Sequence, residues 1–320
     1  MTRPPASAGA ILTPLQKRLR TTRRALAARG LTEAVTWSFI ARAHADLFGG
    51  ANASLILANP ISSEMDTMRP SLLAGLLAAA RRNADRGLTP VLLYEVGQQF
   101  RGDEVSDESF VAALVRKGPA SRHWSNRAKI DTSFDAKADA AALLSALGAP
   151  RDLQTTDDAP GWYHPGRSGT LRLGPKTVLA HFGELHPRIL KAFDIDGPVA
   201  AAEIFIENVP EPKAKPTKAK PPLEASDLMA VKRDFAFLVD ASVKAGDMVR
   251  AAKNVDKALI TDVSVFDVYE GERIEAGKKS VALEVTLQPK EKTLTEEEID
   301  AVSRKIVAAV EKSSGGTLRS

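Results

Sequence analysis

The chain has 320 residues, of which 44% are hydrophobic and 26% charged, so it is long enough for two folded domains and lacks the composition of a disordered protein. It has no cysteine, which excludes disulfides, thiolate metal sites and a cysteine nucleophile. It also has neither an apolar run of about 18 residues nor the apolar core of a signal peptide, so we expect a cytoplasmic protein outside the membrane. The net charge of +4 is uneven, because residues 1–29 carry seven basic residues and no acidic ones, whereas residues 224–320 carry 15 basic and 18 acidic residues; net charge therefore does not indicate nucleic-acid binding by the C-terminal part.

The first predicted element is an amphipathic helix with a very basic face. Thr13 and Pro14 have the residue types that begin a helix, and Gly30 marks its end. Its apolar stripe consists of Leu15, Leu19 and Leu26.

Two short strands and a second helix are expected next. Residues 31–39 and 55–58 have strand-like patterns, and Asn59-Pro60 ends the second strand. Ser71 is expected to cap a helix that stops by Gly87. Its apolar side consists of Leu72, Leu73, Leu76, Leu77 and Ala80.

Further strands and a third helix complete the first region. The strands are expected at residues 91–96, 110–115, 170–173 and 200–206. An alanine-rich helix starts near Asp135 and stops at Gly148-Ala149-Pro150. The elements alternate irregularly and no glycine-rich phosphate turn follows a strand, so an antiparallel α+β domain is predicted rather than a doubly wound sheet.

A proline- and lysine-rich stretch, residues 211–223, separates two regions of the chain. Such a stretch cannot bury a core and is typical of an extended linker. We therefore predict one domain at residues 1–210 and another at residues 224–320.

The second domain has the pattern of a ferredoxin-like fold. Its expected elements, in the order β-α-β-β-α-β, are residues 235–239, 243–257, 260–269, 278–288, 295–313 and 317–319. This fold packs two helices on one face of a four-stranded antiparallel sheet and leaves the other face open.

Alternation along the strands predicts which side chains lie on each face. The helix side receives Phe235, Phe237, Val239, Val263, Val265, Tyr269, Val281, Leu283, Val285 and Leu287. The open face receives Ala236, Leu238, Ser264, Phe266, Ser280, Ala282, Glu284 and Thr286, and a bulge would add Asp267.

Ala236, Phe266, Asp267 and Ser280 are the candidate binding residues of the open face. Small side chains allow an unstacked base to lie flat, and an aromatic ring stacks on it. A carboxylate accepts two hydrogens, N1–H and N2–H, from guanine. The alternative is that Phe266 is half-buried and that Asp267 caps the turn to Glu270-Gly271.

Arg233 is a further candidate, as a phosphate clamp at the start of the first strand of this domain. Its alternative is a salt bridge with Asp234.

Five ordered pieces run through the C-terminal region: Lys232-Arg233-Asp234-Phe235, residues 266–271, residues 277–280, residues 293–298 and Leu318-Arg319. They resemble the ferredoxin-fold anticodon-binding domain that ends the bacterial phenylalanyl-tRNA synthetase beta subunit. Pieces of the first domain resemble the catalytic-like module of that subunit, which is related to class II synthetases: residues 30–39, 59–64, 68–73, 94–97, 164–167 and 183–187.

The resemblance implies a beta-subunit segment of phenylalanine–tRNA ligase that is not catalytic by itself. It implies an alpha subunit as partner, in a heterotetramer of two alpha and two beta subunits, where the alpha subunit uses ATP and magnesium and this segment binds no cofactor. The C-terminal domain is then expected to bind the anticodon of tRNA(Phe), and Asp267 to contact its first base, normally guanine. The alternative is a stand-alone RNA-binding or regulatory paralogue.

The resemblance has two departures. The full subunit carries N-terminal modules for RNA binding, editing and support, and none fits before Met1, so we expect a C-terminal portion, a split gene product or a shortened paralogue without an editing role. Leu228-Met229 stand where the family usually has a proline.

Catalytic chemistry is not expected in this chain. Residues 100–104 resemble the arginine and glutamate of a class II nucleotide-binding loop, but no glycine-rich strand ending in arginine accompanies them, and a polar surface loop explains them equally well. The five histidines lack metal-site spacing, and His164 and His186 precede prolines, which suits rigid turns.

Overall fold

The structure is a computed structural model, and it describes residues 11–118, 124, 132–150, 152–211, 225–272 and 274–319. The predicted linker, apart from Glu211, lies outside these residues. The chain forms two compact units, Met1–Ala214 (unit 1) and Lys215–Ser320 (unit 2). Each unit has its own hydrophobic core.

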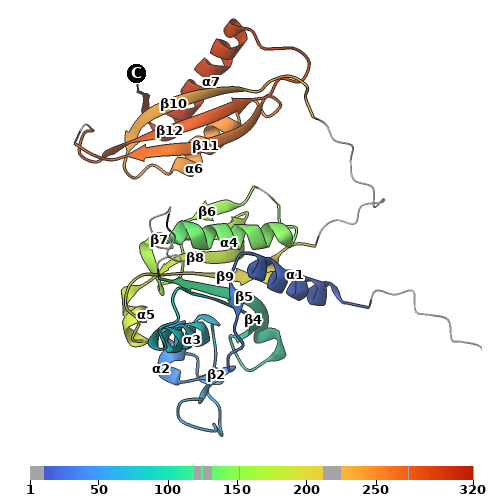
Figure 1. The fold of residues 1–320 in the computed structure, drawn as a ribbon, viewed down its shortest axis with the longest axis vertical. Helices are drawn as coiled ribbons and strands as arrows, with labels where there is room; N and C mark the ends of the chain where they lie inside the picture. The colour runs from blue at the N-terminus through green and yellow to red at the C-terminus, as the bar shows by residue number, and fades with distance from the viewer. Residues whose placement is uncertain are drawn as a thin grey trace, which may run out of the picture. The chain divides into compact units, whose positions relative to one another are not determined.

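A seven-stranded sheet forms the centre of unit 1 (Figure 1). Among its described pairings, β1 with β4 is parallel and the others are antiparallel. The strands in spatial order are β1 (Thr32–Glu33), β4 (Val91–Phe100), β5 (Glu108–Lys117), β9 (Val199–Phe205), β8 (Thr177–Leu185), β7 (Tyr163–Leu173) and β6 (Gln154–Thr156). The predicted antiparallel α+β class is confirmed.

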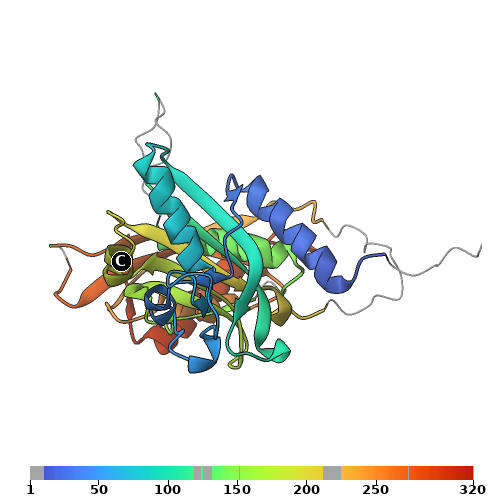
Figure 2. The same cartoon turned by 90° about the horizontal axis from the view of Figure 1, so that it is seen from below.

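Helices cover both faces of this sheet. On one face lie α1 (Pro14–Ala28) and α4 (Ser133–Ala146), and on the other lie α3 (Leu73–Asp85) and α5 (Pro187–Ala192) (Figure 1). Figure 2 shows α3 running beside β4 and β5. The two resulting cores follow strand alternation, because in β5 Ala112 and Leu114 join the first core whereas Val111, Ala113 and Val115 join the second.

The first helix begins and packs as its sequence predicts. Thr13 accepts a hydrogen bond from the backbone N–H of Gln16, and the Gln16 side chain accepts one from Thr13 N–H, which makes a capping box. Leu26 is fully buried, and Leu15 and Leu19 pack against the same core.

The segment between α1 and α3 differs from its prediction. Residues 31–39 form only β1 and the start of β2 (Phe39–Ile40), which pairs with β3 (Thr67–Met68) beside α2 (Arg42–Asp46). Of the strand predicted at residues 55–58, the structure has only an isolated antiparallel bridge between Ile56 and Thr67. Asn52 accepts a hydrogen bond from Ser54 N–H and starts a 3-10 helix, Ala53–Leu55, which buries Leu55. Two other 3-10 helices are Val105–Asp107 and Ile206–Asn208.

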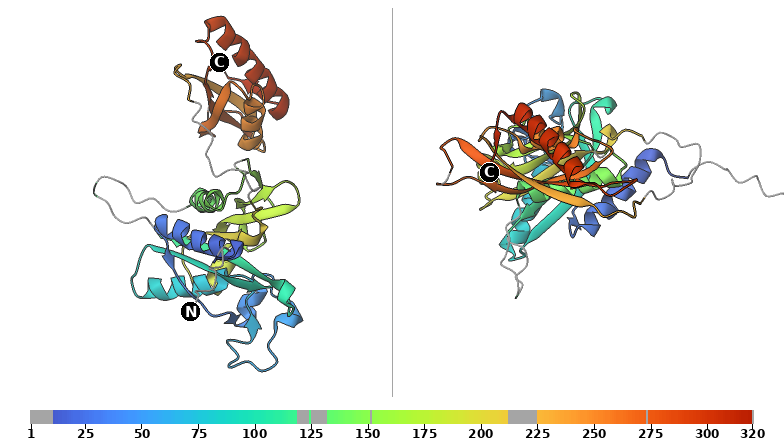
Figure 3. Two further views of the ribbon diagram at one scale, coloured as in Figure 1. Left: turned by 90° about the vertical axis from the view of Figure 1, so that its right-hand side faces the viewer. Right: turned by 90° about the horizontal axis from the view of Figure 1, so that it is seen from above.

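Unit 2 is a four-stranded antiparallel sheet with two helices on one face. Its elements are β10 (Val231–Asp240), α6 (Ala245–Lys253), β11 (Ile260–Tyr269), β12 (Lys278–Leu287), α7 (Glu296–Ser314) and β13 (Thr317–Leu318). The spatial order is β11-β12-β10-β13. The left view of Figure 3 shows α7 on one side of the sheet, and the core places α6 on the same side. The predicted ferredoxin-like fold is confirmed.

Candidate nucleic-acid interface

The sheet of unit 2 has one face packed against its helices and one face that these helices leave uncovered. The packed face buries Phe235, Phe237, Val239, Val281, Leu283, Val285 and Leu287, as alternation predicts. The opposite face, called the open face below, turns toward the viewer in Figure 1.

Three of the predicted binding residues lie in two neighbouring rows across the open face. Ala236 of β10 is opposite Ala282 of β12, and Ala282 is opposite Asp267 of β11. Strands are about 4.8 Å apart, so Ala236 and Asp267 lie roughly 10 Å apart across this alanine row. In the next row, Ser280 lies opposite Leu238 on one side and Tyr269 on the other.

A β-bulge in β11 brings Asp267 to the open face. Val265 is opposite Leu283, whereas the next pairing joins Asp267 to Ala282, so Phe266 is an extra residue in the strand. Phe266 is 58% exposed and Asp267 is exposed within the strand. The structure therefore differs from the alternative in which Phe266 is half-buried and Asp267 caps the following turn.

The same bulge corrects the prediction for Tyr269. Simple alternation places Tyr269 on the helix side, but the extra residue reverses the parity, and Tyr269 lies opposite Ser280 on the open face. Tyr269 is 40% exposed. Sequence reasoning missed this aromatic residue, although the expectation of a bulge before Asp267 was a signal that could have found it.

Arg233 does not join this group. It lies opposite Val285, on the helix side of the sheet, and its Nη1 donates a hydrogen bond to the Lys232 carbonyl at 3.5 Å. An ion pair near the start of β10 instead joins Lys232 Nζ to Glu284 Oε1 at 2.9 Å. Of the five predicted site residues, the structure thus brings together Ala236, Asp267 and Ser280 on the open face, and Phe266 is the exposed extra residue of the bulge beside them.

The end of the open face near the start of β10 is acidic. Asp234 lies opposite Glu284. In the neighbouring row, Thr286 has Lys232 on one side and Asp262 on the other. The hydrogen bond from Lys232 to Glu284 raises the pKa of the lysine, and the charges of Asp234 and Asp262 act in the same direction. This end of the face therefore disfavours phosphate groups.

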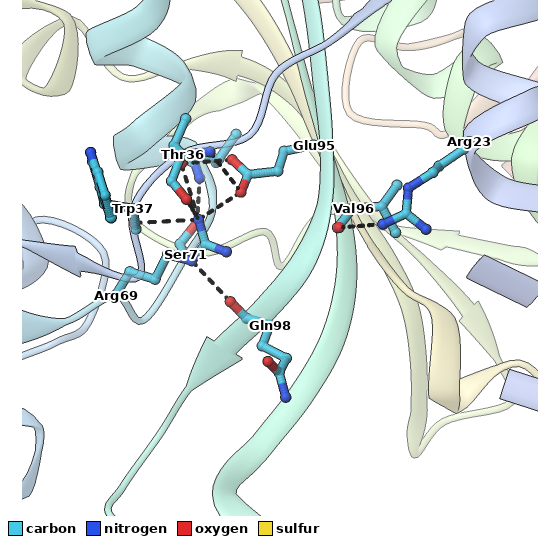
Figure 4. Close-up of polar contacts among 9 residues, drawn as sticks. Arg23, Thr36, Trp37, Arg69, Ser71, Glu95, Val96 and Gln98 are labelled. Carbon is cyan, nitrogen blue, oxygen red and sulfur yellow. Dashed lines mark hydrogen bonds and ion pairs between the residues drawn. The ribbon is translucent and has the colours of Figure 1, made fainter. Parts of the chain in front are cut away.

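Unit 1 contains a buried polar cluster around Arg69, shown in Figure 4. Arg69 Nη1 contacts Glu95 Oε1 at 2.7 Å and Thr36 Oγ1 at 3.0 Å, and its Nε donates to the Gln98 carbonyl at 2.9 Å. Thr36 Oγ1 in turn donates to Glu95 Oε2 at 2.7 Å. These groups satisfy one another and fix the segment around Thr36, so they are not arranged to hold a ligand.

A second buried carboxylate in unit 1, Glu203, is also satisfied within the chain. It accepts hydrogen bonds from Ser71 Oγ at 2.6 Å, Trp162 Nε1 at 3.0 Å and Tyr163 OH at 3.2 Å. Burial raises the pKa of Glu203, and these hydrogen bonds oppose that shift.

The loop resembling a nucleotide-binding loop links β4 to β5. Its Arg101 is exposed, and the Arg101 backbone N–H donates to the Asp107 carbonyl at 3.0 Å. Within the described ranges, no group of three or more His, Cys, Asp or Glu residues is placed to hold a metal ion. His164, which lies within β7 rather than in a turn, and His186, the N-cap of α5, each accept a backbone N–H through Nδ1, from Gly166 and Arg188, at 3.1 Å.

Family comparisons agree with these two units. The family described as "Phenylalanyl tRNA synthetase beta chain CLM domain" matches residues 1–206, and "Ferredoxin-fold anticodon binding domain" matches residues 226–319. In the part of the chain that the structure describes, no helix is long and apolar enough to cross a membrane.

Individual relatives are similar over nearly the whole chain. It is 58% identical over 315 residues to the phenylalanine–tRNA ligase beta subunit of Bradyrhizobium diazoefficiens and 57% identical over 316 residues to that of Rhodopseudomonas palustris. Each comparison covers 97% of this chain and 39% of the relative, so the chain spans about two-fifths of the length of these curated relatives. A solved pyrrolysyl-tRNA synthetase from Desulfitobacterium hafniense has a TM-score of 0.46 and 16% identity, covering 61% of this chain and 65% of that one.

Proposed function

Since the chain belongs to the phenylalanyl-tRNA synthetase beta chain family, we propose that it is a non-catalytic segment of a phenylalanine–tRNA ligase whose unit 2 binds the anticodon of tRNA(Phe). The observation that carries this proposal is the pair of rows on the open face. One row has the partly exposed Ala236, the buried Ala282 and the exposed carboxylate of Asp267, and the other has the buried Ser280 and a half-exposed tyrosine.

These rows suit one splayed base. The side chains of Ala236 and Ala282 are small enough for a base to lie flat above them, and Tyr269 and Phe266 provide exposed rings for stacking. Asp267, at the end of the alanine row, is placed to accept N1–H and N2–H from guanine. Ser280, beside Tyr269, is only 6% exposed and adds a small side chain to this floor.

The domain boundaries at residues 210 and 224 are part of the same proposal. Unit 1 is the bracing domain and unit 2 the RNA-binding domain. We assign phenylalanine activation to an alpha subunit, which would hold ATP and magnesium in a cytoplasmic heterotetramer of two alpha and two beta subunits. The internally satisfied clusters around Arg69 and Glu203 support a bracing role for unit 1, because their polar atoms are already bonded to the chain.

The base contact is tested by Asp267→Asn in the full chain. The substitution keeps the size of the side chain but presents an amide N–H₂ to the donors of guanine. Binding of an anticodon stem-loop with guanine in the first position is expected to weaken by about 1–3 kcal/mol, whereas stem-loops with adenine, cytosine or uracil there change less. Fluorescence anisotropy with labelled stem-loops measures the four affinities.

Asp262→Asn is the matched control, because Asp262 is an exposed carboxylate on the same strand and face, two rows away. Equal effects of the two substitutions, or an Asp267→Asn protein that still prefers guanine as wild type does, would refute the base contact. The bracing role is tested separately by co-purification with an alpha subunit. Retained RNA binding without any alpha-subunit binding would remove the ligase assignment.

A further inference from the structure

The open face extends one residue beyond β13, at Arg319. Leu318 pairs with Phe237 and Thr317 pairs with Leu238, and the Arg319 backbone N–H then donates to the Ala236 carbonyl at 2.7 Å. The ladder therefore continues by one residue, with Arg319 beside Ala236. Residues opposite one another in an antiparallel pair share a face, so Arg319 lies on the open face, where it is exposed.

This placement gives the alanine row a charge of opposite sign at each end. From one edge of the sheet to the other, the row reads Arg319, Ala236, Ala282 and Asp267. Three strand spacings separate its ends, or roughly 14 Å between backbone positions. The floor between the charges consists of the two alanines.

The two charges define a direction for a bound nucleotide. A guanine whose Watson–Crick edge meets Asp267 carries its ribose and phosphate at the opposite end of the base, which is the Arg319 end. The neighbouring row toward the start of β10, with Asp234 and Glu284, is acidic. The phosphate is therefore drawn toward Arg319 and away from that row.

We propose that Arg319 binds the backbone phosphate of the nucleotide whose base lies on Ala236 and Ala282. Arginine presents several N–H donors in a planar fork that matches phosphate oxygens, and such contacts position a nucleic acid without reading its sequence. This proposal rests on anticodon binding by unit 2. It adds an orientation, with the base edge at β11 and the phosphate at β13.

Arg319→Gln and Arg319→Lys in the full chain test this contact against the four anticodon stem-loops across a range of salt concentrations. Arg319→Gln is expected to weaken binding about tenfold for all four stem-loops, because a phosphate contact does not depend on the base. The slope of log affinity against log salt should fall by about 0.7, the value for one phosphate on a single strand. Arg319→Lys, which keeps the charge, should retain most of the wild-type affinity and most of the wild-type salt slope.

Arg304→Gln is the matched control, because Arg304 is an exposed arginine on α7. All three variants keep the backbone N–H groups. An Arg319→Gln protein with wild-type affinity and salt slope would overturn the phosphate contact and leave anticodon binding standing. A loss confined to the guanine stem-loop would also overturn it, because that result means a base contact. A wild-type chain that binds none of the four stem-loops removes the proposed function and this inference together.

Discussion

Asp139 is a fully buried carboxylate that joins three parts of unit 1. It lies in α4 and forms ion pairs with Arg29, just beyond α1, and with Arg116 of β5, whose Nε is 2.5 Å from Asp139 Oδ2. The residues are far apart in the chain, so this cluster connects α1, α4 and the central sheet. A buried charge that loses its counter-ion is costly, because solvent does not replace the lost partner.

We therefore expect Asp139→Asn to lower the free energy of unfolding of unit 1 by about 3 kcal/mol. All three tryptophans of the chain, Trp37, Trp124 and Trp162, belong to unit 1, so tryptophan fluorescence during urea denaturation follows this unit. Asp46→Asn, at an exposed position in α2, is the control. A loss no larger than that of the control would contradict the structural role of Asp139.

His181 predicts a pH dependence of the same unit. Burial lowers the pKa of His181 from 6.5 to about 4, and its Nδ1 lies 2.9 Å from Thr170 Oγ1. The folded state thus keeps the ring neutral at pH values where the unfolded chain protonates it. The stability from His181 is complete above pH 6.5 and is lost as the pH falls through the folded pKa of about 4.

The expected loss between pH 7 and pH 4 is up to about 3 kcal/mol from this residue. His181→Gln removes the titrating group, so the variant should lose less stability than wild type over the same range. Urea denaturation of both proteins at several pH values, followed by tryptophan fluorescence, measures the difference. Parallel curves for the two proteins would show that His181 does not titrate as expected.

At the scale of elements, α7 is held at its start by a capping box. Thr295 Oγ1 accepts the Glu298 backbone N–H at 3.3 Å, and Glu298 Oε2 accepts the Thr295 N–H at 3.0 Å. Thr295→Ala should destabilise unit 2 by about 1 kcal/mol, because the backbone N–H of Glu298 loses its acceptor. Unit 2 contains no tryptophan, so its unfolding is measured as the far-ultraviolet circular-dichroism transition that is absent from tryptophan fluorescence.

Thr293→Ala is the control for this cap, because Thr293 is exposed just before the helix and is not its N-cap. If the two alanine variants unfold alike, the capping box does not stabilise the helix in solution.

The elements show which predictions a sequence supports by itself. In β12, Val281, Leu283, Val285 and Leu287 are buried as predicted, although Ser280 and Ala282 on the opposite face are buried as well. Helix starts are also local signals, as the capping of α1 and α7 illustrates. These predictions succeed because the determining residues lie within a few positions of one another.

β11 shows where the same reasoning fails. One extra residue, Phe266, reverses the facing of every residue after it, so Tyr269 moves from the helix side to the open face. The position of a bulge depends on how β12 pairs with β11, and that pairing is not visible in β11 alone. The strand predicted at residues 55–58 is reduced to a single bridge between Ile56 and Thr67, and the Asn52 cap places Leu55 in a 3-10 helix instead.

At the scale of the whole molecule, distant pairings were the least predictable features. Ser71 and Glu203 are 132 residues apart and Arg29 and Asp139 are 110 apart, and each pair meets only because of the order of the strands and helices. The division into two units follows from composition, since a proline- and lysine-rich stretch lies between two regions with their own apolar patterns.

The alanine and serine rows of the open face come from three strands that are separated along the chain, and this has a thermodynamic consequence. Ala236, Asp267 and Ser280 are neighbours only after β10, β11 and β12 have paired. RNA that binds there recognises the folded state alone, so binding and folding of unit 2 are linked equilibria. An anticodon stem-loop at 100 times its dissociation constant should add about 2.7 kcal/mol to the unfolding free energy of unit 2.

Calorimetry of the full chain with and without the stem-loop measures this linkage. The calorimetric transition of unit 2 should move to higher temperature. The transition of unit 1, followed by tryptophan fluorescence in the same samples, should stay at the same temperature. A stem-loop that shifts the tryptophan transition instead would place the RNA on unit 1. Under the proposed assignment, RNA acts as a ligand that protects one half of the chain from unfolding and leaves the other half unprotected.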